Sequence, residues 1–244
     1  MPDWNNTLIL VNKPLHWTSF DVVKKAKNLL KVKKIGHAGT LDPLAEGLLI
    51  LATGSETKNI TLIQELEKTY EATFCLGATT QSLDREFFPT DFHETRGITQ
   101  ELIEQTIHKH FMGDIQQSPP GYSAVKINGT RAYKLARLQK VFETTPKTVT
   151  IHKFSISSVH VITPKNLPEY TEESVQVEDS DTELLLFETT IVCSKGTYIR
   201  ALAGDLGRIL GVSGYLTALK RTAIGSYQLS DAYEIQSLAS EQTD

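Results

Sequence analysis

The stretch from Gly36 to Lys58 places the strongest constraint on how this chain can fold. It reads GHAGTLDPLAEGLLILATGSETK and combines closely spaced glycines with one apolar run, Leu48 to Ala52. A short apolar run bounded by turn residues is typical of a strand buried on both faces. Glycines let the backbone bend tightly or approach a ligand closely. The stretch therefore predicts a tight loop that presents one acidic side chain, Asp42, beside a buried strand.

Asp42 also has a simpler interpretation. Asp followed by Pro is a common start of a helix, because Asp is a preferred N-cap residue and Pro fits the first helical position. Gly47 and the apolar run follow so soon, however, that any helix starting at Pro43 is about one turn long. A capping aspartate needs no glycines around it. On the residues alone, both interpretations of Asp42 stay open.

The composition is that of an ordinary globular protein. The chain has 244 residues, 40% apolar and 22% charged, which allows one large domain or two small ones. No apolar run approaches the 18 or so residues of a membrane span, and the start, MPDWNNTLIL, does not resemble a signal peptide. We therefore expect a cytoplasmic protein without a membrane segment.

The two cysteines, Cys75 and Cys193, lie in strand-like runs, so we expect buried free thiols. Two cysteines cannot make a disulfide framework, and no Cys/His cluster has the spacing of zinc ligands. The sequence suggests neither a metal nor a cofactor.

The distribution of charge says more about partners than the net charge of -4 does. Residues 24 to 34 carry six lysines and no acid, whereas acids gather in residues 169 to 188 and in the tail from Asp231. A lysine-rich helix face is often merely solvated. Its position directly before the glycine-rich stretch favours an anionic substrate.

Hydrophobic periodicity predicts the elements that surround this stretch. Strands are expected at 8–11, 68–74, 149–162 and 183–193, and helices from a Ser19 cap to Leu30 and at 57–66, 100–112, 131–139 and 200–210. Tyr70, Ala72 and Phe74 should share one face of their strand. Asn128-Gly129 is a turn pair, and the polar, acidic residues 164–181 should form an exposed loop.

The segment GHAGTLDPLAEGLL resembles the active-site motif of the tRNA pseudouridine synthase B family, G-H-x-G-T/A-L-D-P-x-A-x-G-x-L, whose aspartate is catalytic. Further segments agree with the family in the same order, across residues 8 to 229: LVNKPLHWTS from Leu10, KTY from Lys68, QSPPGYSAVK from Gln117, CSKGTYIR from Cys193 and LKRTAIG from Leu219. The resemblance thus extends over nearly the whole chain.

The resemblance implies a fold and an activity. The fold would be α+β, with a mixed, largely antiparallel central sheet flanked by helices. The activity would be isomerisation of uridine 55 in the T arm of tRNA to pseudouridine, on a base flipped out of the helix and without metal or cofactor. Asp42 would be the carboxylate that attacks C1', adds to C6 or removes a proton from C2'. The sequence does not choose among these roles.

The resemblance also implies binding residues. His37 would hold the flipped nucleotide, Tyr70 and Tyr198 would enclose the uracil, and Leu219 would form an apolar wall. Arg200 would pair with Asp42; an arginine at a helix start opposes the helix dipole, which independently predicts an anionic partner. The expected contacts to the RNA backbone are Lys13, Lys24, Lys25, Lys33, Lys34, Lys126 and Arg137.

The chain departs from the family pattern at a few positions. His16 stands where the pattern usually has Gly, Gln81 replaces an Asp, Ser82 a Thr, and Phe87 a Gly, while Asp84 is in place. Many bacterial relatives continue into a PUA domain, for which there is no room after Tyr233. We expect a single catalytic domain over residues 1–244, acting as a monomer on tRNA.

Two other classes of function stay open. A non-catalytic RNA-binding module would use the basic and aromatic residues without needing Asp42. A glycoside or nucleoside hydrolase commonly needs two carboxylates, and only Glu46 lies near Asp42 in the sequence. A phosphate-loop nucleotide binder is excluded because its GxxxxGK[S/T] motif is missing. Base conversion, base release or neither would distinguish the remaining classes.

Overall fold

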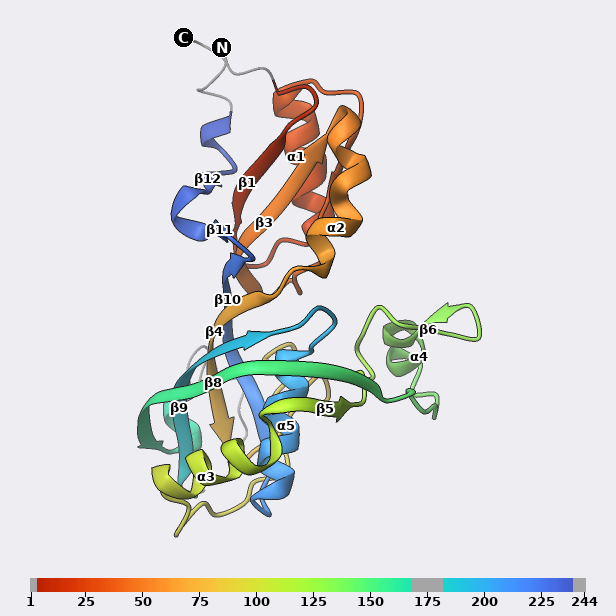
Figure 1. Ribbon diagram of the computed structural model, residues 1–244. Coiled ribbons are helices and arrows are strands. Elements are labelled where there is room, and N and C mark those ends of the chain that lie inside the picture. Colours follow the sequence, from red (N-terminus) through yellow and green to blue (C-terminus); the bar gives the residue numbers. More distant parts are fainter. Residues whose placement is uncertain (1–3, 168–181, 239–244) are drawn as a thin grey trace. The chain divides into compact units, whose positions relative to one another are not determined.

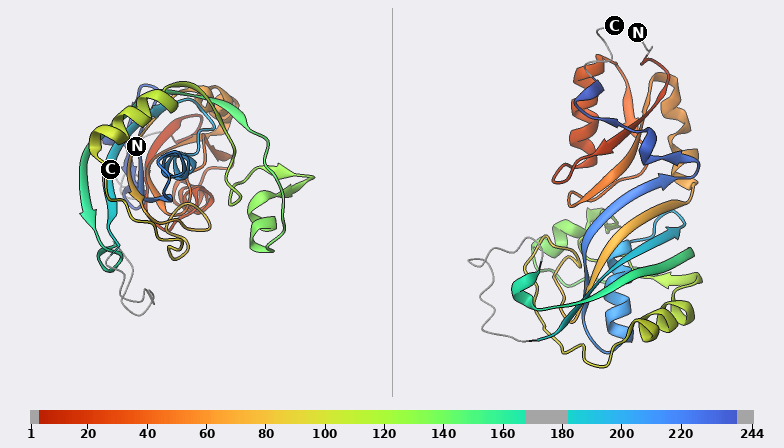
Figure 2. Two further views of the ribbon diagram at one scale, coloured as in Figure 1. Left: turned by 90° about the horizontal axis from the view of Figure 1, so that it is seen from below. Right: turned by 90° about the vertical axis from the view of Figure 1, so that its left-hand side faces the viewer.

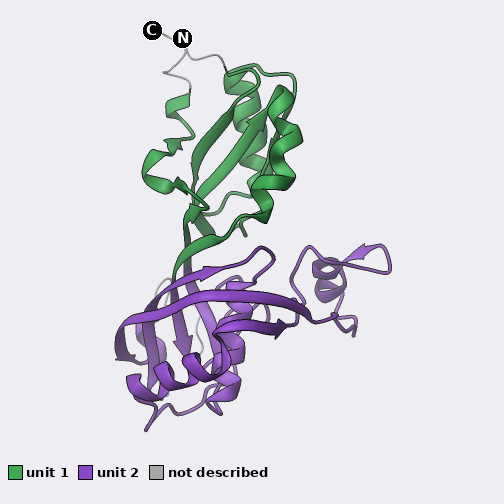
Figure 3. Ribbon diagram, viewed as in Figure 1, with its two compact units in different colours: residues 1–71, 219–244 green, residues 72–218 purple. Residues whose placement is uncertain are grey.

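The computed structural model describes residues 4–167 and 182–238 and divides the chain into two compact units (Figure 3). Unit 1 comprises residues 1–71 and 219–244, and unit 2 comprises residues 72–218. Strands β4 (Lys68–Leu76) and β10 (Gly214–Ile224) each run from one unit into the other. Most of the acidic loop expected at 164–181 lies outside the described residues.

Unit 1 is a mixed sheet with helices (Figure 1). Its strands are β1 (Leu8–Lys13), β2 (Ile35–His37), β3 (Ala45–Thr53), β11 (Tyr227–Gln228) and β12 (Tyr233–Glu234), and its helices are α1 (Ser19–Leu30) and α2 (Ile60–Glu65). Short 3-10 helices span Gly54–Asn59 and Leu229–Asp231. The strand order is β12-β1-β3-β10, with β2 on β3 and β11 on β10. β3 pairs with β1 antiparallel and with β10 parallel.

Strand β3 is buried on both faces, as its apolar run predicts. Leu49 and Leu51 join the cluster that contains Val22 and Ala26 of α1. Leu48 and Ile50 join a second cluster, which contains Ile63 of α2. Because successive side chains of a strand point to opposite faces, a strand covered by a helix on each side requires an uninterrupted apolar sequence.

Helix α1 is capped one residue earlier than predicted. The Thr18 hydroxyl accepts a hydrogen bond from Asp21 N at 3.1 Å, and the Asp21 carboxylate accepts one from Thr18 N at 2.9 Å, which is a reciprocal capping box. The expected cap, Ser19, instead lies inside the helix. Its hydroxyl accepts from Leu41 N at 2.9 Å and donates to Leu41 O at 3.2 Å. Ser19 therefore fixes the residue directly before Asp42.

Unit 2 is a largely antiparallel sheet with the strand order β10-β4-β9-β8-β5. Figure 2 shows α5 end-on, with β8 and β9 curving past it. The elements of this unit are β5 (Gly113–Gln117), β6 (Lys126–Ile127), β7 (Thr130–Arg131), β8 (Lys147–Ile162), β9 (Leu184–Cys193), α3 (Gln100–His110), α4 (Ala132–Arg137), α5 (Ile199–Ile209) and a 3-10 helix, Pro164–Asn166. The predicted Asn128-Gly129 turn joins β6 to β7, with positive φ at both residues. The mixed sheet with helices confirms the expected α+β class.

Several phenylalanines pack together in the core of unit 2. Phe154 of β8 lies 5.9 Å, centroid to centroid, from both Phe74 of β4 and Phe111 after α3. Cys75 and Cys193 are buried free thiols, as predicted, and burial raises the pKa of Cys75 to about 12. In neither described range, 4–167 or 182–238, is a helix long and apolar enough to cross a membrane.

Candidate active site

Asp42 lies in a turn and caps no helix. Pro43 and Leu44 form a single turn in which Ala45 N donates to Asp42 O at 3.0 Å, and β3 begins at Ala45. The Asp42 side chain is half-buried. Because no helix follows, the simpler interpretation of the Asp-Pro pair is wrong. The aspartate is presented by a loop between β2 and β3.

The buried Arg221 of β10 holds this loop from within unit 1. Its Nε donates to Leu48 O at 2.8 Å and its Nη2 to Gly39 O at 3.2 Å, and only 1% of the residue is exposed. The backbone of Arg221 pairs with Gly47, where φ is +103° and a Cβ atom would lie 2.3 Å from Arg221 O. Only glycine allows this approach. Sequence reasoning gave Arg221 no role; its signal was a charged residue within an otherwise strand-like segment.

Lys13 is a second buried cation beside the same loop. Its Nζ donates to Trp17 O at 2.6 Å, to Pro14 O at 2.8 Å and to Pro43 O at 3.4 Å, and its side chain is fully buried. Burial lowers its pKa to about 8, and attraction to Asp42 and Glu46 opposes that shift. This differs from the contact with RNA phosphates that the sequence suggested. An ammonium enclosed by three carbonyls holds the turn after Asp42 and is not presented to a phosphate.

Three predicted substrate-binding residues also lie in unit 1. Tyr70 is buried on β4, on the same face as Ala72, so the predicted alternation is confirmed. Leu219 is half-buried and pairs in register with Ala45, three residues after Asp42. The pKa of His37 is lowered, mainly by burial and further by the charge of Arg221, while a backbone hydrogen bond with Gly39 acts against the shift. The imidazole is therefore neutral near pH 7.

Most of the predicted backbone-binding cations are exposed, as contact with phosphate requires. Lys24 and Lys25 lie on α1, and Lys33 and Lys34 follow it. In unit 2 the exposed residues are Lys126 of β6 and Arg137 of α4. Arg137 is engaged within its unit, because its Nη2 lies 2.7 Å from Glu86 Oε1 and its guanidinium 6.0 Å from the Tyr133 ring centroid.

Arg200 is the centre of a buried network in unit 2. It lies in the first turn of α5, 4% exposed, and donates to Ser82 O at 2.9 Å and to Tyr122 O at 2.7 Å. Its Nε lies 3.9 Å from Asp84 Oδ2. The Asp84 carboxylate also accepts from Ser82 Oγ at 2.5 Å. The anionic partner predicted for Arg200 is thus Asp84, while its pairing with Asp42 stays a prediction.

Two positions that depart from the family pattern both contact Tyr122. The Tyr122 hydroxyl donates to Gln81 Oε1 at 3.3 Å, and its ring centroid lies 5.0 Å from that of Phe87. Since the carbonyl of Tyr122 accepts from Arg200, these substitutions lie around one support of the buried arginine. Ser82, a third departure, keeps the hydroxyl that binds Asp84.

The backbone of Tyr198 is held by a glutamine. Gln117 accepts from Tyr198 N at 2.8 Å and donates to Tyr198 O at 3.1 Å, which ties the end of β5 to the start of α5. The side chain of Tyr198 is half-buried. Gln117 belongs to the QSPPGYSAVK segment, and sequence reasoning had given it no role.

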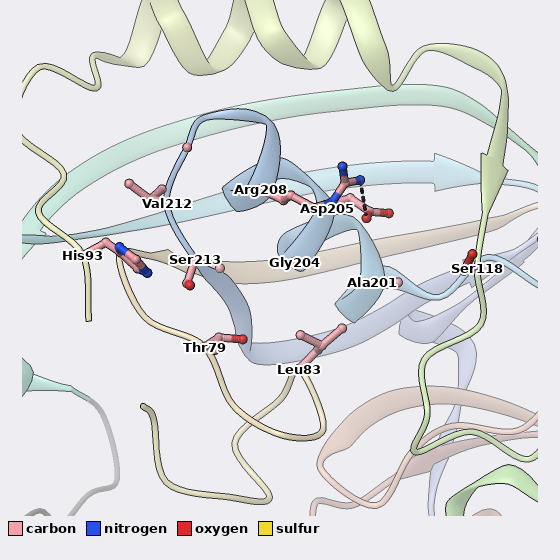
Figure 4. A pocket seen from close by; sticks show the side chains of 12 residues that line it. Thr79, Leu83, His93, Ser118, Ala201, Gly204, Asp205, Arg208, Val212 and Ser213 are labelled. Atoms are coloured by element: carbon pink, nitrogen blue, oxygen red, sulfur yellow. Dashed lines mark hydrogen bonds and ion pairs between the residues drawn. The ribbon is translucent and has the colours of Figure 1, made fainter. Parts of the chain in front are cut away.

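Unit 2 also contains a cavity of about 570 Å³, whose lining side chains are drawn in Figure 4. Ala201 and Gly204 of α5 line it, together with Leu83, which lies between Ser82 and Asp84 in the sequence. At its edge Arg208 donates to Asp205 at 3.0 Å, and the dashed line in Figure 4 marks this bond. The Arg200–Asp84 ion pair therefore lies close to an open cavity.

The fold is that of the pseudouridine synthases. A chain in the crystal structure of a Cbf5-Nop10-Gar1 complex matches with a TM-score of 0.65 and 23% identity, covering 98% of this chain and 55% of that one. A chain in the structure of an H/ACA RNP bound to a substrate RNA containing 2'-deoxyuridine matches with a TM-score of 0.62 and 21% identity, covering 98% and 53%. This chain thus spans about half the length of those neighbours, and such low identity shows the fold alone.

Sequence comparison defines the family more narrowly. Residues 27–199 match the model of the TruB family pseudouridylate synthase, N-terminal domain. Three relatives named tRNA pseudouridine synthase B align over nearly the whole chain: 41% identity in Flavobacterium johnsoniae (93% of this chain, 92% of the relative), 42% in Chlorobaculum tepidum (96% and 90%) and 43% in Bacteroides fragilis (93% and 90%). The chain belongs to the TruB family of pseudouridylate synthases.

Proposed function

We propose that this protein converts uridine 55 in the T arm of tRNA to pseudouridine and that Asp42 is the catalytic carboxylate. One observation carries the assignment of Asp42: its loop is fixed on both sides by buried groups. Ser19 binds Leu41 before it, and Lys13 binds Pro43 after it. The relatives named tRNA pseudouridine synthase B, aligned over more than 90% of the chain, support the choice of tRNA as substrate.

The electrostatics of unit 1 suit a carboxylate that reacts in its ionised form. Among the charges that raise the pKa of Lys13, Asp42 acts most strongly, and Arg221 is close enough to lower it. The ammonium and the guanidinium therefore lie near the aspartate turn. Nearby positive charge favours the ionised state of a carboxylate. The turn that carries Asp42 thus lies near two buried cations.

The proposed reaction rearranges the uridine without adding or removing atoms overall. The N1–C1' bond breaks, the uracil turns in its site, C5 bonds to C1', and the proton on C5 moves to N1 through solvent. Asp42 would attack C1', add to C6 or take the C2' proton, and each role requires an ionised carboxylate and a base outside its stack.

The remaining predicted residues take supporting roles in this proposal. His37, neutral near pH 7, would hold the flipped nucleotide through hydrogen bonds, and Tyr70 and Leu219 would contact the uracil. Tyr198 and Arg200 would be the substrate-binding residues supplied by unit 2. The exposed cations would bind phosphates, namely Lys24, Lys25, Lys33, Lys34, Lys126 and Arg137. We further propose that the chain acts in the cytoplasm as a monomer and that its two units make up one catalytic domain.

The test uses T-arm RNA carrying tritium at C5 of its uridines. We expect the wild type to release tritium and form pseudouridine, and Asp42→Asn to lose at least about 1000-fold in rate, because the amide cannot replace a nucleophile or base. RNA affinity should change less than about threefold. Glu46→Gln is the matched control, since Glu46 pairs with Lys220 at 3.4 Å and should be dispensable.

The same samples distinguish the other classes of function. Release of free uracil would indicate a hydrolase. Tight binding by the wild type without any pseudouridine would indicate an RNA-binding module. Full activity of the Asp42→Asn variant would show that Asp42 is not the catalytic residue.

A further inference from the structure

We propose that a pocket on helix α1 binds a nucleotide that flanks the target uridine on the same RNA strand. This inference rests on the proposed function, because it assigns a second contact to the same substrate. The pocket has a volume of about 370 Å³, which lies within the range of sites for small ligands, roughly 300 to 1,000 Å³. It is lined by His16, Trp17, Asp21, Lys24, Lys25 and Asn28.

The pocket is connected to the Asp42 turn by hydrogen bonds within unit 1. His16 N donates to Pro43 O at 2.9 Å. The Lys13 ammonium donates to Trp17 O and to Pro43 O, so it bridges the pocket wall and the turn. An RNA strand whose uridine lies at Asp42 therefore has its neighbouring nucleotides close to this pocket. This continuity favours substrate RNA over a free nucleotide or an acidic peptide as the occupant.

The charges of the pocket match a phosphate. Lys24 and Lys25 are exposed on the polar face of α1. The single acid, Asp21, is engaged in the helix cap, because Oδ2 accepts from Thr18 N at 2.9 Å and from Thr18 Oγ1 at 2.5 Å. Two cations thus face the pocket while the carboxylate binds the cap. Lysines placed in this way neutralise backbone phosphates without reading sequence.

The aromatic rings of the pocket match a base. Trp17 packs partly against the core cluster of α1, so its position is fixed. His16 has φ +66°, a left-handed conformation that favours glycine, and the family pattern has Gly there. An imidazole at this position adds a flat wall that glycine would lack. Bases of any kind stack on such rings.

The test replaces nucleotides beside the target uridine of a T-arm hairpin, one at a time, by an abasic residue. We expect one abasic position to weaken binding to the wild type about tenfold, because the base in the pocket is missing. The His16→Gly variant should bind intact RNA about fivefold more weakly than the wild type. Its affinity should fall little further when the abasic residue is placed at that position. Glycine is compatible with the left-handed backbone, so this variant keeps the fold.

The lysines are tested with a matched pair of double variants. The double variant Lys24→Ala/Lys25→Ala should bind RNA with a Kd about tenfold higher than that of the wild type. The slope of log Kd against log salt concentration should fall by about 1.5, which corresponds to the loss of two phosphate contacts. Lys109→Ala with Lys153→Ala removes two exposed lysines of unit 2 and should change Kd less than twofold.

Pseudouridine is measured in every sample, so the two proposals can fail separately. If the wild type forms pseudouridine but His16→Gly and wild type lose equal affinity at every abasic position, the pocket proposal is overturned and the proposed function stands. Equal effects of the two lysine pairs would also overturn it. If the wild type forms no pseudouridine, the proposed function fails and the pocket proposal fails with it.

Discussion

In unit 1, two buried cations support a loop that carries an aspartate, whereas in unit 2 a buried arginine is itself supported by an aspartate and two carbonyls. Lys13 and Arg221 bind main-chain oxygens around Asp42 and leave its carboxylate half-buried. Arg200 binds Ser82 O and Tyr122 O and lies beside Asp84. Buried charge therefore positions a backbone in one unit and positions a side chain in the other. The two units should therefore respond differently to the loss of a buried charge.

The largest expected effect comes from removing either buried arginine. Arg200→Leu leaves the buried Asp84 without its cation and should cost about 4 kcal/mol of unfolding free energy. Arg221→Leu should cost a similar amount, because Leu48 O and Gly39 O lose a charged donor. Urea unfolding measures both. A second change, Asp84→Asn, should restore about 1 to 2 kcal/mol to Arg200→Leu and nothing to Arg221→Leu. Equal rescue of both would contradict the distinction between the units.

The Gly47→Ala substitution should lower the unfolding free energy by about 3 kcal/mol, because the new methyl group clashes with the backbone of Arg221 and the left-handed φ adds strain. The matched control is Gly129→Ala in the β6–β7 turn, where φ is +81° and no atom lies within 4 Å of the added Cβ. That variant should cost only about 1 to 2 kcal/mol. The difference between the two variants in thermal unfolding gives the cost of the steric clash between β3 and β10, apart from the cost of the left-handed backbone conformation.

Lys13 should make the stability depend on pH. Its pKa is about 8 in the folded protein against 10.5 for an ordinary lysine, so the unfolded state binds more protons between these values. The unfolding free energy contributed by this group therefore rises with pH, by about 2 kcal/mol between pH 7.5 and 9.5. Lys13→Met should lack this gain in urea unfolding at the two pH values. An identical pH slope in both proteins would show that the pKa of Lys13 is not lowered in the folded protein.

The smallest effect is expected at Phe87, which contacts the Tyr122 ring. Phe87→Ala should cost about 1 kcal/mol more than Phe88→Ala, its more exposed neighbour, because it loses an aromatic pair. We also expect a reduction of a few fold in pseudouridine formation, since Tyr122 O binds Arg200. Unchanged turnover would show that the contact between Phe87 and Tyr122 does not help to position Arg200.

Local patterns predicted much of the fold. The apolar run of β3 and the alternation around Tyr70 lie buried where expected, and a helix forms within the predicted range 100–112. These features depend on neighbours in the sequence, so periodicity reveals them. The anionic partner of Arg200 was expected for a similar local reason, its place at a helix start.

The roles of the buried cations could not be predicted in this way. Lys13 binds a carbonyl 30 residues away and Arg221 one 182 residues away. Strand register decides these contacts, and no local pattern encodes which carbonyl will face a given cation. A lysine in a family motif therefore suggested phosphate binding, although its surroundings are carbonyls. The cap at Thr18 was missed because Thr18 and Ser19 are both good caps and only the backbone distinguishes them.

The parallel pairing of β3 with β10 has a consequence for the order of events during synthesis. Gly47 pairs with Arg221, 174 positions later in the sequence, whereas unit 2 is one continuous segment, residues 72–218. Ribosomes add about 5 to 20 residues per second, so unit 2 can begin to fold while the first 71 residues still lack their partner strand. The Asp42 loop receives its arginine only once residue 221 has emerged. A nascent chain from which residue 221 has not yet emerged therefore lacks a completed Asp42 loop and should not modify RNA.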